Sequence, residues 1–484
     1  MTDRRAVYRL QLSPSFAFGD AAGLGGYLAG LGVSHVHLSP CLEARGGSPH
    51  GYDVVDPTRI RRELGGDTGF EELVSSFRSD GLGVLLDFVP NHMAASHENP
   101  WWWDVLLRGR ESRYARYFDI DWYPPQPELA GKVLIPVLPC PLAEALERGD
   151  IGIAESDGGR TVTYGDLLFP IAEGSLRESR PGRRALADLL ARQHYVLAHW
   201  ARGPTQLNYR RFANVPGLVG VRVEDEEVFE AMHAKVLDLL DRGLIDGLRI
   251  DHVDGLRDPA GYLERLRSKA PGAWIVVEKI LTRDERLRRE WPVEGTTGYD
   301  FLNLAGGLFV DQSGEAAMSE LYEELTGASA SYAGLEREKK LLVLDRLFPA
   351  ELGRLSRAAL RLRRLHAPEL DGAPVAEAVR ELLASFPVYR TYVRADAGSA
   401  RRKDAERVDE AIRLASEARR DLGLPVWTFL RDLLLLRYRG GEEADFAARF
   451  QQLTGPVTAK GVEDTAFYCF NRLISLNEVG GDPG

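Results

Sequence analysis

Acidic and basic side chains follow directly after two apolar segments of the sequence. Asp251 follows residues 244–250, and Glu278 follows residues 274–277. Arg249 precedes Asp251 by two positions, so the two side chains share one face of an extended strand. A guanidinium at that spacing can hydrogen-bond the carboxylate and keep it ionised. Carboxyl groups on neighbouring strand ends can break glycosidic bonds, one acting as nucleophile and the other as general acid.

The separation of two such carboxyl groups sets the stereochemistry of the reaction. Groups about 5–5.5 Å apart suit a retaining enzyme, whereas an inverting pair stands about 6.5–9.5 Å apart to admit a water. Asp251 and Glu278 are separated by the length of one strand–helix–strand unit. We therefore expect them on adjacent strands, about 4.8 Å apart, which favours the retaining arrangement.

Other polar side chains follow the remaining predicted strands. In a parallel barrel all strands end at the same rim, which is the catalytic face. Several polar strand ends converging on one rim indicate a functional site more strongly than any one of them alone. Besides Asp251 and Glu278, the residues expected at this rim are Asp87, Asn91, His92, Arg249, His252, Lys279, Glu463 and Asp464.

A metal site is the alternative interpretation of a rim rich in histidine and carboxylate. His35 and His37 form a His-x-His pair on an early strand. The later part of the chain offers no histidines at matching ligand spacing. The sequence therefore predicts no metal site.

Strand-like and helix-like segments alternate along most of the chain. Thr68 and Glu71 have the spacing of a capping box at the start of one helix. Residues 455–459 are interpreted as a short late strand. The other predicted strands are residues 8–12, 33–38, 81–89, 244–250 and 274–277, and predicted helices include residues 21–31, 68–77, 336–348 and 407–420.

This alternation predicts an α/β fold, a (β/α)8 barrel interrupted by two insertions. No glycine-rich dinucleotide fingerprint follows the first strands, which disfavours an open doubly wound sheet. The predicted segments are residues 1–92 as the first part of the barrel, 93–215 as a subdomain inserted after strand 3, 216–311 as the region of strands 4–6, 312–440 as a helical insertion, and 441–484 as a late strand with its polar end.

Composition argues against nucleic-acid and membrane partners. The 484 residues carry a net charge of −11, so the chain lacks the basic character of a nucleic-acid binder. No segment approaches the roughly 18 uninterrupted apolar residues of a membrane span, and no signal peptide opens the chain. Cys41, Cys140 and Cys469 are too few and too scattered for a disulfide framework. We expect a cytoplasmic protein with a neutral substrate.

Four short segments together resemble the alpha-amylase superfamily of glycoside hydrolases. They are DFVPNH at residues 87–92, GLRIDH at 247–252, VE at 277–278 and HGYD at 50–53. Within that superfamily the sequence is most similar to the maltooligosyl trehalose synthases, and this resemblance runs from residue 8 to residue 483. The segments that carry it are residues 8–12, 48–54, 208–212, 278–281, 460–468 and 476–483.

The resemblance implies roles for three carboxylates and for the residues that surround the sugar. Asp251 is the nucleophile, Glu278 the general acid and base, and Asp464 the third carboxylate, which holds the sugar hydroxyls. Glu463 departs from the superfamily, which usually has a histidine directly before this aspartate, but the synthase resemblance accommodates it. The residues expected to line the sugar-binding site are His50, Tyr52, Asp53, Asn91, His92, Arg249, His252 and Lys460.

The implied reaction is an intramolecular transglycosylation on a maltooligosaccharide or linear α-1,4-glucan. Its reducing-end α-1,4 linkage becomes an α,α-1,1 linkage, with no organic cofactor and no catalytic metal, and a trehalose-releasing hydrolase acts next. The alternatives are an α-glucan hydrolase of the same superfamily and an inactive, truncated glucan-binding protein. The resemblance also implies that the chain ends early, because synthases continue beyond the segment matched by residues 476–483.

Overall fold

A computed structural model describes residues 4–484 apart from 157–158, 177–181, 283, 329–330 and 398–399. The chain divides into two compact units. The first comprises Met1–Asp251 and Arg265–Val276, and the second comprises His252–Glu264 and Val277–Gly484. Asp251 therefore belongs to the first unit, whereas Glu278 and Asp464 belong to the second.

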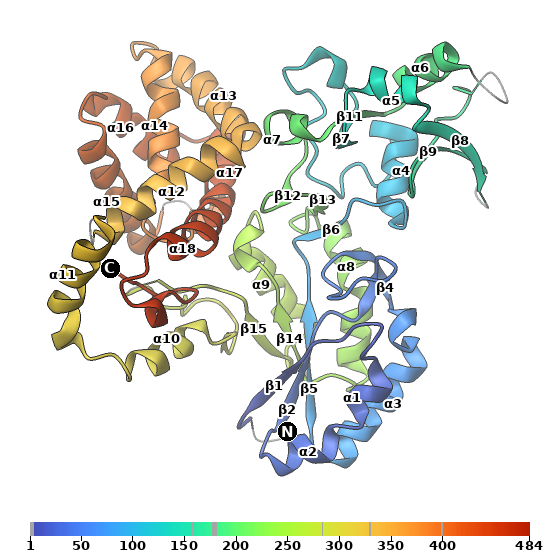
Figure 1. Cartoon of the computed structure of the whole chain (residues 1–484), viewed down its shortest axis with the longest axis horizontal. Coiled ribbons are helices and arrows are strands. Elements are labelled where there is room, and N and C mark those ends of the chain that lie inside the picture. Colours follow the sequence, from blue (N-terminus) through green and yellow to red (C-terminus); the bar gives the residue numbers. More distant parts are fainter. Residues whose placement is uncertain (1–3, 157–158, 177–181, 283, 329–330, 398–399) are drawn as a thin grey trace. The chain divides into compact units, whose positions relative to one another are not determined.

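The first unit is built on a parallel sheet whose strands alternate with helices along the chain (Figure 1). The strand order in space, β1-β2-β5-β14-β15, is also the order in sequence. Successive strands of a (β/α) barrel have this relation, so the expected barrel arrangement is present for its first five strands. The strands are β1 (Val7–Leu10), β2 (His35–Leu38), β5 (Gly83–Phe88), β14 (Gly247–Ile250) and β15 (Trp274–Val277), and all five were predicted with ends that differ by a few residues.

Amphipathic helices connect these strands. In α3 (Gly66–Ser79) the apolar stripe of Phe70, Leu73, Val74 and Phe77 is buried, as its spacing predicts. The predicted capping box at Thr68 is wrong, because a 3-10 turn leads into the helix and Gly65 occupies the N-cap. The other helices of this series are α1 (Phe18–Ala22), α2 (Gly25–Gly30), α8 (Glu226–Asp241) and α9 (Pro259–Lys269), the last with residues in both units.

Between β5 and α8 the chain forms small sheets and short helices rather than barrel elements. One three-stranded sheet consists of β6, β12 and β13, and a second consists of β8, β9 and β10. The strands of this region are β6 (His92–Ala94), β7 (Val133–Leu138), β8 (Ile151–Ser156), β9 (Gly159–Tyr164), β10 (Leu167–Pro170), β11 (Tyr195–His199), β12 (Arg211–Phe212) and β13 (Val215–Gly220). The helices are α4 (Pro100–Arg108), α5 (Leu142–Arg148), α6 (Arg183–Ala191) and α7 (Gly203–Gln206), and an earlier hairpin pairs β3 (Leu42–Ala44) with β4 (Val54–Ile60).

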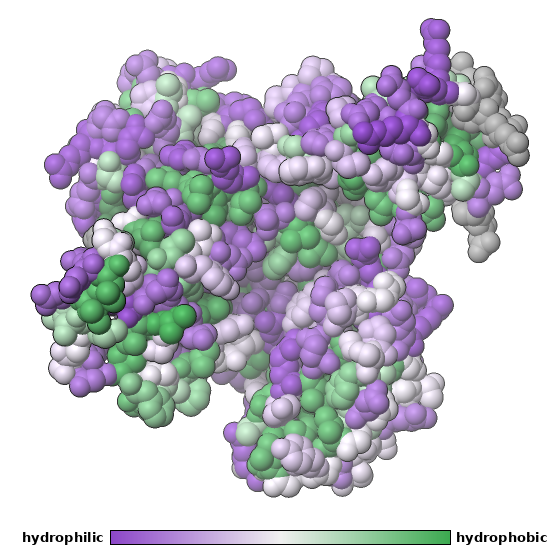
Figure 2. Space-filling model, in the orientation of Figure 1, coloured by the Kyte–Doolittle hydropathy of each residue, from purple (hydrophilic) through white to green (hydrophobic). Residues whose placement is uncertain are grey.

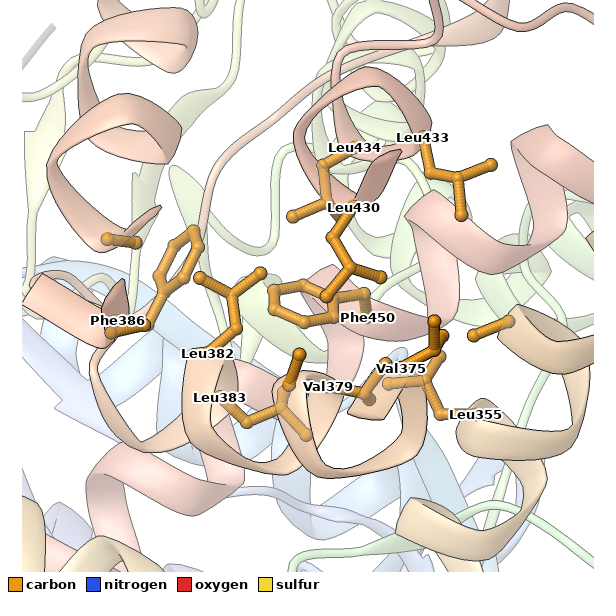
Figure 3. Close-up of a cluster of buried hydrophobic side chains, with 14 of the residues drawn as sticks. Leu355, Val375, Val379, Leu382, Leu383, Phe386, Leu430, Leu433, Leu434 and Phe450 are labelled. Carbon is orange, nitrogen blue, oxygen red and sulfur yellow. The ribbon is translucent and has the colours of Figure 1, made fainter. Parts of the chain in front are cut away.

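The second unit is mainly helical, and its helices share one hydrophobic core. Figure 3 shows Leu382, Leu383 and Phe386 packed near Phe450 and Leu430. The helices contributing to this core are α12 (Tyr332–Arg346), α13 (Pro349–His366), α14 (Gly372–Ala384), α15 (Arg402–Ala418), α16 (Leu424–Leu434) and α17 (Gly441–Thr458). The unit also contains α10 (Tyr299–Gly307), α11 (Glu315–Thr326), α18 (Phe467–Cys469) and the short strand β16 (Gly295–Thr296). The helices predicted at residues 336–348 and 407–420 are confirmed as α12 and α15, which each begin earlier and end two residues earlier than predicted.

The late strand predicted at residues 455–459 is wrong. These residues end α17 and begin a π-helical segment, η8 (Ala459–Ala466). Phe446, Phe450, Leu453 and Val457 recur every three or four positions and are all buried. Packing of this helical stripe on the core therefore prevails over the helix-breaking tendency of Pro456. The five segment boundaries expected from the sequence remain a prediction.

Candidate active site

In the first unit, Asp251 lies just beyond β14 beside an arginine that bridges two carboxylates. Arg249 stands directly opposite Asp87 of the neighbouring strand β5. Its Nη1 donates to Asp87 Oδ1 at 2.9 Å and also to Asp251 Oδ1. The backbone amide of Asp251 donates to the carbonyl oxygen of Phe88 at 2.9 Å. The expected contact between Arg249 and Asp251 is thus present, and all three charged groups are buried.

Asp87 is the centre of this polar cluster. Its Oδ2 accepts a hydrogen bond from the Tyr52 hydroxyl at 2.6 Å and lies 3.5 Å from Nε2 of His37. Burial alone would raise the pKa of Asp87, but hydrogen bonding to His37 and the charge of Arg249 hold it below its ordinary value. Burial, and next the Asp87 charge, raise the pKa of Tyr52. Asp87 is therefore an ionised anchor that orients Tyr52 and Arg249.

A glycine shapes the loop that presents Tyr52. Gly51 has φ +79°, and a Cβ there would lie 2.3 Å from the carbonyl oxygen of Pro40. The Tyr52 amide donates to Nδ1 of exposed His50 at 3.0 Å, and Asp53 Oδ1 lies 3.8 Å from the same nitrogen. In this structure His50 and Asp53 therefore stabilise the loop, while Tyr52 reaches the Asp87 cluster.

Asn91 and His92 are buried at the beginning of the insertion. Asn91 Oδ1 accepts a hydrogen bond from Arg210 Nη1 at 2.6 Å. The His92 ring lies 4.6 Å from the ring of Phe212, measured between centroids. Arg210 and Phe212 come from segment 208–212, so this segment positions both side chains.

In the second unit, Glu278 contacts the residue that follows Asp251. The backbone amide of His252 donates to Glu278 Oε2 at 2.7 Å. His252 has φ +46° and ψ +47°, a left-handed conformation that is uncommon for a residue with a Cβ. Such conformations persist where their surroundings enforce them, often at functional sites. The turn after Asp251 therefore supplies a fixed hydrogen-bond donor to Glu278.

The π-helical segment η8 presents the third carboxylate. Asp464 is 55% exposed, and its Oδ2 lies 2.5 Å from Nζ of Lys460. The neighbouring Glu463 accepts a hydrogen bond from the hydroxyl of Tyr389. Burial, together with the negative charges of Asp464 and Glu278, raises the pKa of Glu463 to about 7. π-Helical turns are rare in proteins as a whole and often occur at functional sites.

The predicted site residues are thus distributed over both units, and their catalytic and binding roles remain predictions. Sequence reasoning assigned no role to Asp87, Arg210 or Tyr389. The position of Asp87 at a strand end was a usable signal, whereas the partners of Arg210 and Tyr389 are distant in sequence. The predicted site residues in the first unit are His50, Tyr52, Asp53, Asn91, His92, Arg249 and Asp251, and the predicted site residues in the second unit are His252, Glu278, Lys460 and Asp464.

Neither a cluster of metal-ligating side chains nor a membrane-spanning helix is found in the described part of the chain. Among these residues, no three His, Cys, Asp or Glu side chains are grouped so as to hold a metal ion. His35 and His37 instead contact the Trp274 ring and the Asp87 carboxylate, respectively. None of the helices described here combines the length and the apolar character needed to cross a membrane.

A family model matches part of this chain, and individual known proteins are similar to nearly all of it. Residues 13–142 match the family model described as alpha amylase, catalytic domain. A putative maltooligosyl trehalose synthase of Mycobacterium tuberculosis is 41% identical over 99% of this chain and 58% of its own length. The chain therefore spans little more than half of the curated relatives that it matches.

Solved structures agree with this similarity. Maltooligosyltrehalose synthase from Arthrobacter ramosus is 39% identical, with a TM-score of 0.86 over 99% of this chain and 58% of that one. A Sulfolobus tokodaii protein described as a hypothetical maltooligosyl trehalose synthase is 35% identical, with a TM-score of 0.78 over 99% of this chain and 58% of that one. These matches confirm the fold class, a (β/α)8 barrel of the alpha-amylase type.

Proposed function

Because this chain belongs to the alpha-amylase superfamily, we propose that it rearranges α-1,4-glucans. The reaction is the conversion of the reducing-end α-1,4 linkage of a maltooligosaccharide into an α,α-1,1 linkage. The observation that carries the proposal is the similarity to maltooligosyl trehalose synthases along 99% of the chain. The product is a glucan that ends in a trehalose unit, which a trehalose-releasing hydrolase would then consume.

In the proposed mechanism two carboxyl groups act in turn. Asp251 attacks C1 of the penultimate glucose while Glu278 protonates the departing oxygen of the reducing-end glucose, and a glycosyl-enzyme forms. The released glucose stays bound and turns. Glu278 then removes the proton from the anomeric hydroxyl of the released glucose. The anomeric oxygen attacks the glycosyl-enzyme and releases Asp251. The anomeric configuration at the attacked carbon is retained through two displacements.

Contacts within each unit support these roles. The guanidinium of Arg249 donates to Asp251 Oδ1 and orients this carboxyl group, as a nucleophile requires. The amide of His252 donates to Oε2 of Glu278 and so orients its carboxyl group for proton transfer. Asp464 is exposed enough to accept hydrogen bonds from sugar hydroxyls, and the ammonium group of Lys460 balances the charge of its carboxylate. Neither an organic cofactor nor a metal is required for these steps.

We also propose a cytoplasmic location, which the thiol content supports. Cys41, Cys140 and Cys469 are all free. Unpaired thiols are typical of proteins from reducing compartments.

Product analysis with maltopentaose tests the proposed activity. A synthase lowers the concentration of reducing ends while the number of glucose residues per chain stays at five. A hydrolase of the same superfamily raises the concentration of reducing ends and shortens the chain. Binding of maltopentaose without any product would instead identify an inactive glucan-binding protein and contradict the proposal.

A further inference from the structure

Buried side chains from a distant segment of the second unit donate hydrogen bonds to the turn that follows Asp251. Arg390 Nη1 donates to the carbonyl oxygens of Asp254 and Leu256, at 2.6 and 2.7 Å. The Tyr392 hydroxyl donates to Asp254 Oδ1 at 2.5 Å. These contacts hold residues 254–256, which follow His252 in the same unit, and so stabilise the turn that begins with its left-handed backbone.

Lys279 is a buried cation directly after Glu278. Its residue is 2% exposed. Nζ donates to the carbonyl oxygen of Ile280 at 2.5 Å and lies 3.3 Å from both Asp254 Oδ2 and Glu285 Oε2. An ammonium group is buried at a large desolvation cost, which such partners must offset. This ammonium is enclosed by protein groups, so it is not placed to contact a substrate.

Two contacts therefore join the segment of Glu278 to the turn after Asp251. In one, the His252 amide donates to the Glu278 carboxylate. In the other, the ammonium group of Lys279 forms an ion pair with the carboxylate of Asp254, which lies in the turn. Since Glu278 and Lys279 are consecutive, the second contact fixes the backbone from which the Glu278 side chain extends.

We propose that Lys279 is a positioning residue that, through its ion pair with Asp254, holds the Glu278 carboxylate against the amide of His252. The pair acts on Glu278 only through the backbone and does not touch the reacting atoms. This inference rests on the proposed role of Glu278 in catalysis, but the hydrogen bond that it concerns can be measured without turnover.

Hydrogen exchange measured by mass spectrometry on the full chain tests the positioning directly. Lys279→Met keeps the length of the side chain and removes its charge. We expect exchange at the His252 amide to become at least about tenfold faster, because its acceptor is no longer held in place. Asp254→Asn removes the same ion pair while keeping an acceptor for Tyr392, and it should give the same change if Lys279→Met fails to fold.

A second buried lysine of the same unit provides a matched control. Lys340 is 1% exposed, lies 2.6 Å from Glu336 and donates to the carbonyl oxygen of Phe386 at 3.0 Å. Lys340→Met removes a comparable buried charge and should lower the melting temperature without changing exchange at His252. If Lys279→Met and Asp254→Asn leave that exchange within twofold of the wild type, the proposed positioning is wrong.

Turnover of maltopentaose gives an independent measurement. We expect Lys279→Met to lower kcat by about 10- to 100-fold with KM nearly unchanged, because a misplaced acid weakens the chemical step rather than binding. If the wild-type chain shows no turnover, the proposed function fails while the exchange experiment still decides the role of Lys279. If kcat is unchanged although exchange increases, Lys279 orders the turn without serving catalysis, which would overturn its role as a positioning residue.

Discussion

One guanidinium serves two carboxylates in the first unit. Arg249 contacts Asp87 as well as Asp251, while Tyr52 and His37 contact Asp87 from the other side. Asp87 thus has several buried partners that hold it in place. Asp87 is therefore expected to orient Arg249 and Tyr52, whereas Asp251, at the end of β14, is expected to act as the nucleophile.

Replacement of Asp251 by asparagine tests this assignment. Asp251→Asn keeps the size of the side chain and removes its nucleophilic oxygen, so we expect turnover to fall by about four orders of magnitude or more. Binding of maltopentaose, measured by calorimetry, should survive. The exposed Asp241→Asn on α8 is the control and should keep wild-type turnover. Residual activity above about 1% in Asp251→Asn would contradict a nucleophilic role.

The ionisation of Glu463 is expected to make the stability of the folded chain depend on pH. Its pKa is raised from 4.5 to about 7 by burial and by the nearby charges of Asp464 and Glu278, against the opposing effects of Tyr389 and Lys460. The folded state therefore keeps a proton that the unfolded chain releases near pH 4.5. Stability should consequently fall as pH rises from about 4.5 to about 7 through this group.

Melting temperatures of Glu463→Gln and wild type measure this contribution. The glutamine cannot ionise, so the variant should gain stability relative to wild type between pH 5 and pH 7, by about 2–5 °C in melting temperature. Glu442→Gln removes an exposed carboxylate from α17 and should show no such gain. A difference between Glu463→Gln and wild type that does not change with pH would show that Glu463 titrates normally.

Side chains on one strand could be related from sequence spacing, but partners from distant segments could not. Alternation along a strand places Arg249 beside Asp251, and the structure shows that contact. The partner of Glu463 depends on how the helical region folds, and no local pattern encodes that. Tyr389, for example, is separated from Glu463 by 74 residues.

At the scale of elements, one close approach fixes the neighbouring strands β14 and β15. A Cβ at Gly247 would lie 1.9 Å from the carbonyl oxygen of Trp274. Real Cβ atoms essentially never lie within 3 Å of such a neighbouring atom. Here the neighbouring atom belongs to the backbone, which cannot rotate away as a side chain can. The strand that leads to Asp251 can therefore run beside β15 only because residue 247 has no side chain.

Gly247→Ala should consequently destabilise the first unit. Overpacking of this kind typically costs about 1–3 kcal/mol, and a backbone obstacle places this case at the upper end of that range. Gly217→Ala in β13 is a matched control, since nothing lies within 4 Å of its Cβ position. Chemical denaturation of both variants checks the difference. Equal midpoints for Gly247→Ala and Gly217→Ala would show that β14 and β15 are not so closely spaced.

Elements with a regular apolar pattern were predictable, and the irregular ones were not. The five parallel strands follow from short apolar runs, and α3 follows from its stripe of four buried residues. Residues 455–459 include Gly455 and Pro456, which suggest an extended segment by local preference. Their helical form depends on burial of Val457 against the core of α12–α17, a contact that local preference does not contain.

At the scale of the whole molecule, α10 and α11 expose an unusual amount of apolar surface. Leu304 of α10 is 73% exposed, Leu308 and Phe309 in the turn directly after α10 are 84% and 90% exposed, and Leu325 of α11 is 74% exposed. Figure 2 shows hydrophobic surface over these two helices. Contiguous apolar patches of this kind usually mark interaction surfaces or aggregation-prone regions, whereas single exposed leucines do not.

We therefore expect the 484-residue chain to associate with itself through α10 and α11. Removal of this apolar surface from water favours association, so sedimentation velocity should show a weight-average mass that rises with concentration above the 53.7 kDa of the monomer. The double variant Leu308→Lys, Phe309→Glu should sediment as a monomer at every concentration, because association would then bury charges. Leu365 on α13 is 69% exposed but stands apart from this patch, so Leu365→Lys should associate like the wild type. A wild-type chain that stays monomeric, or a double variant that associates equally, would exclude α10 and α11 as the contact.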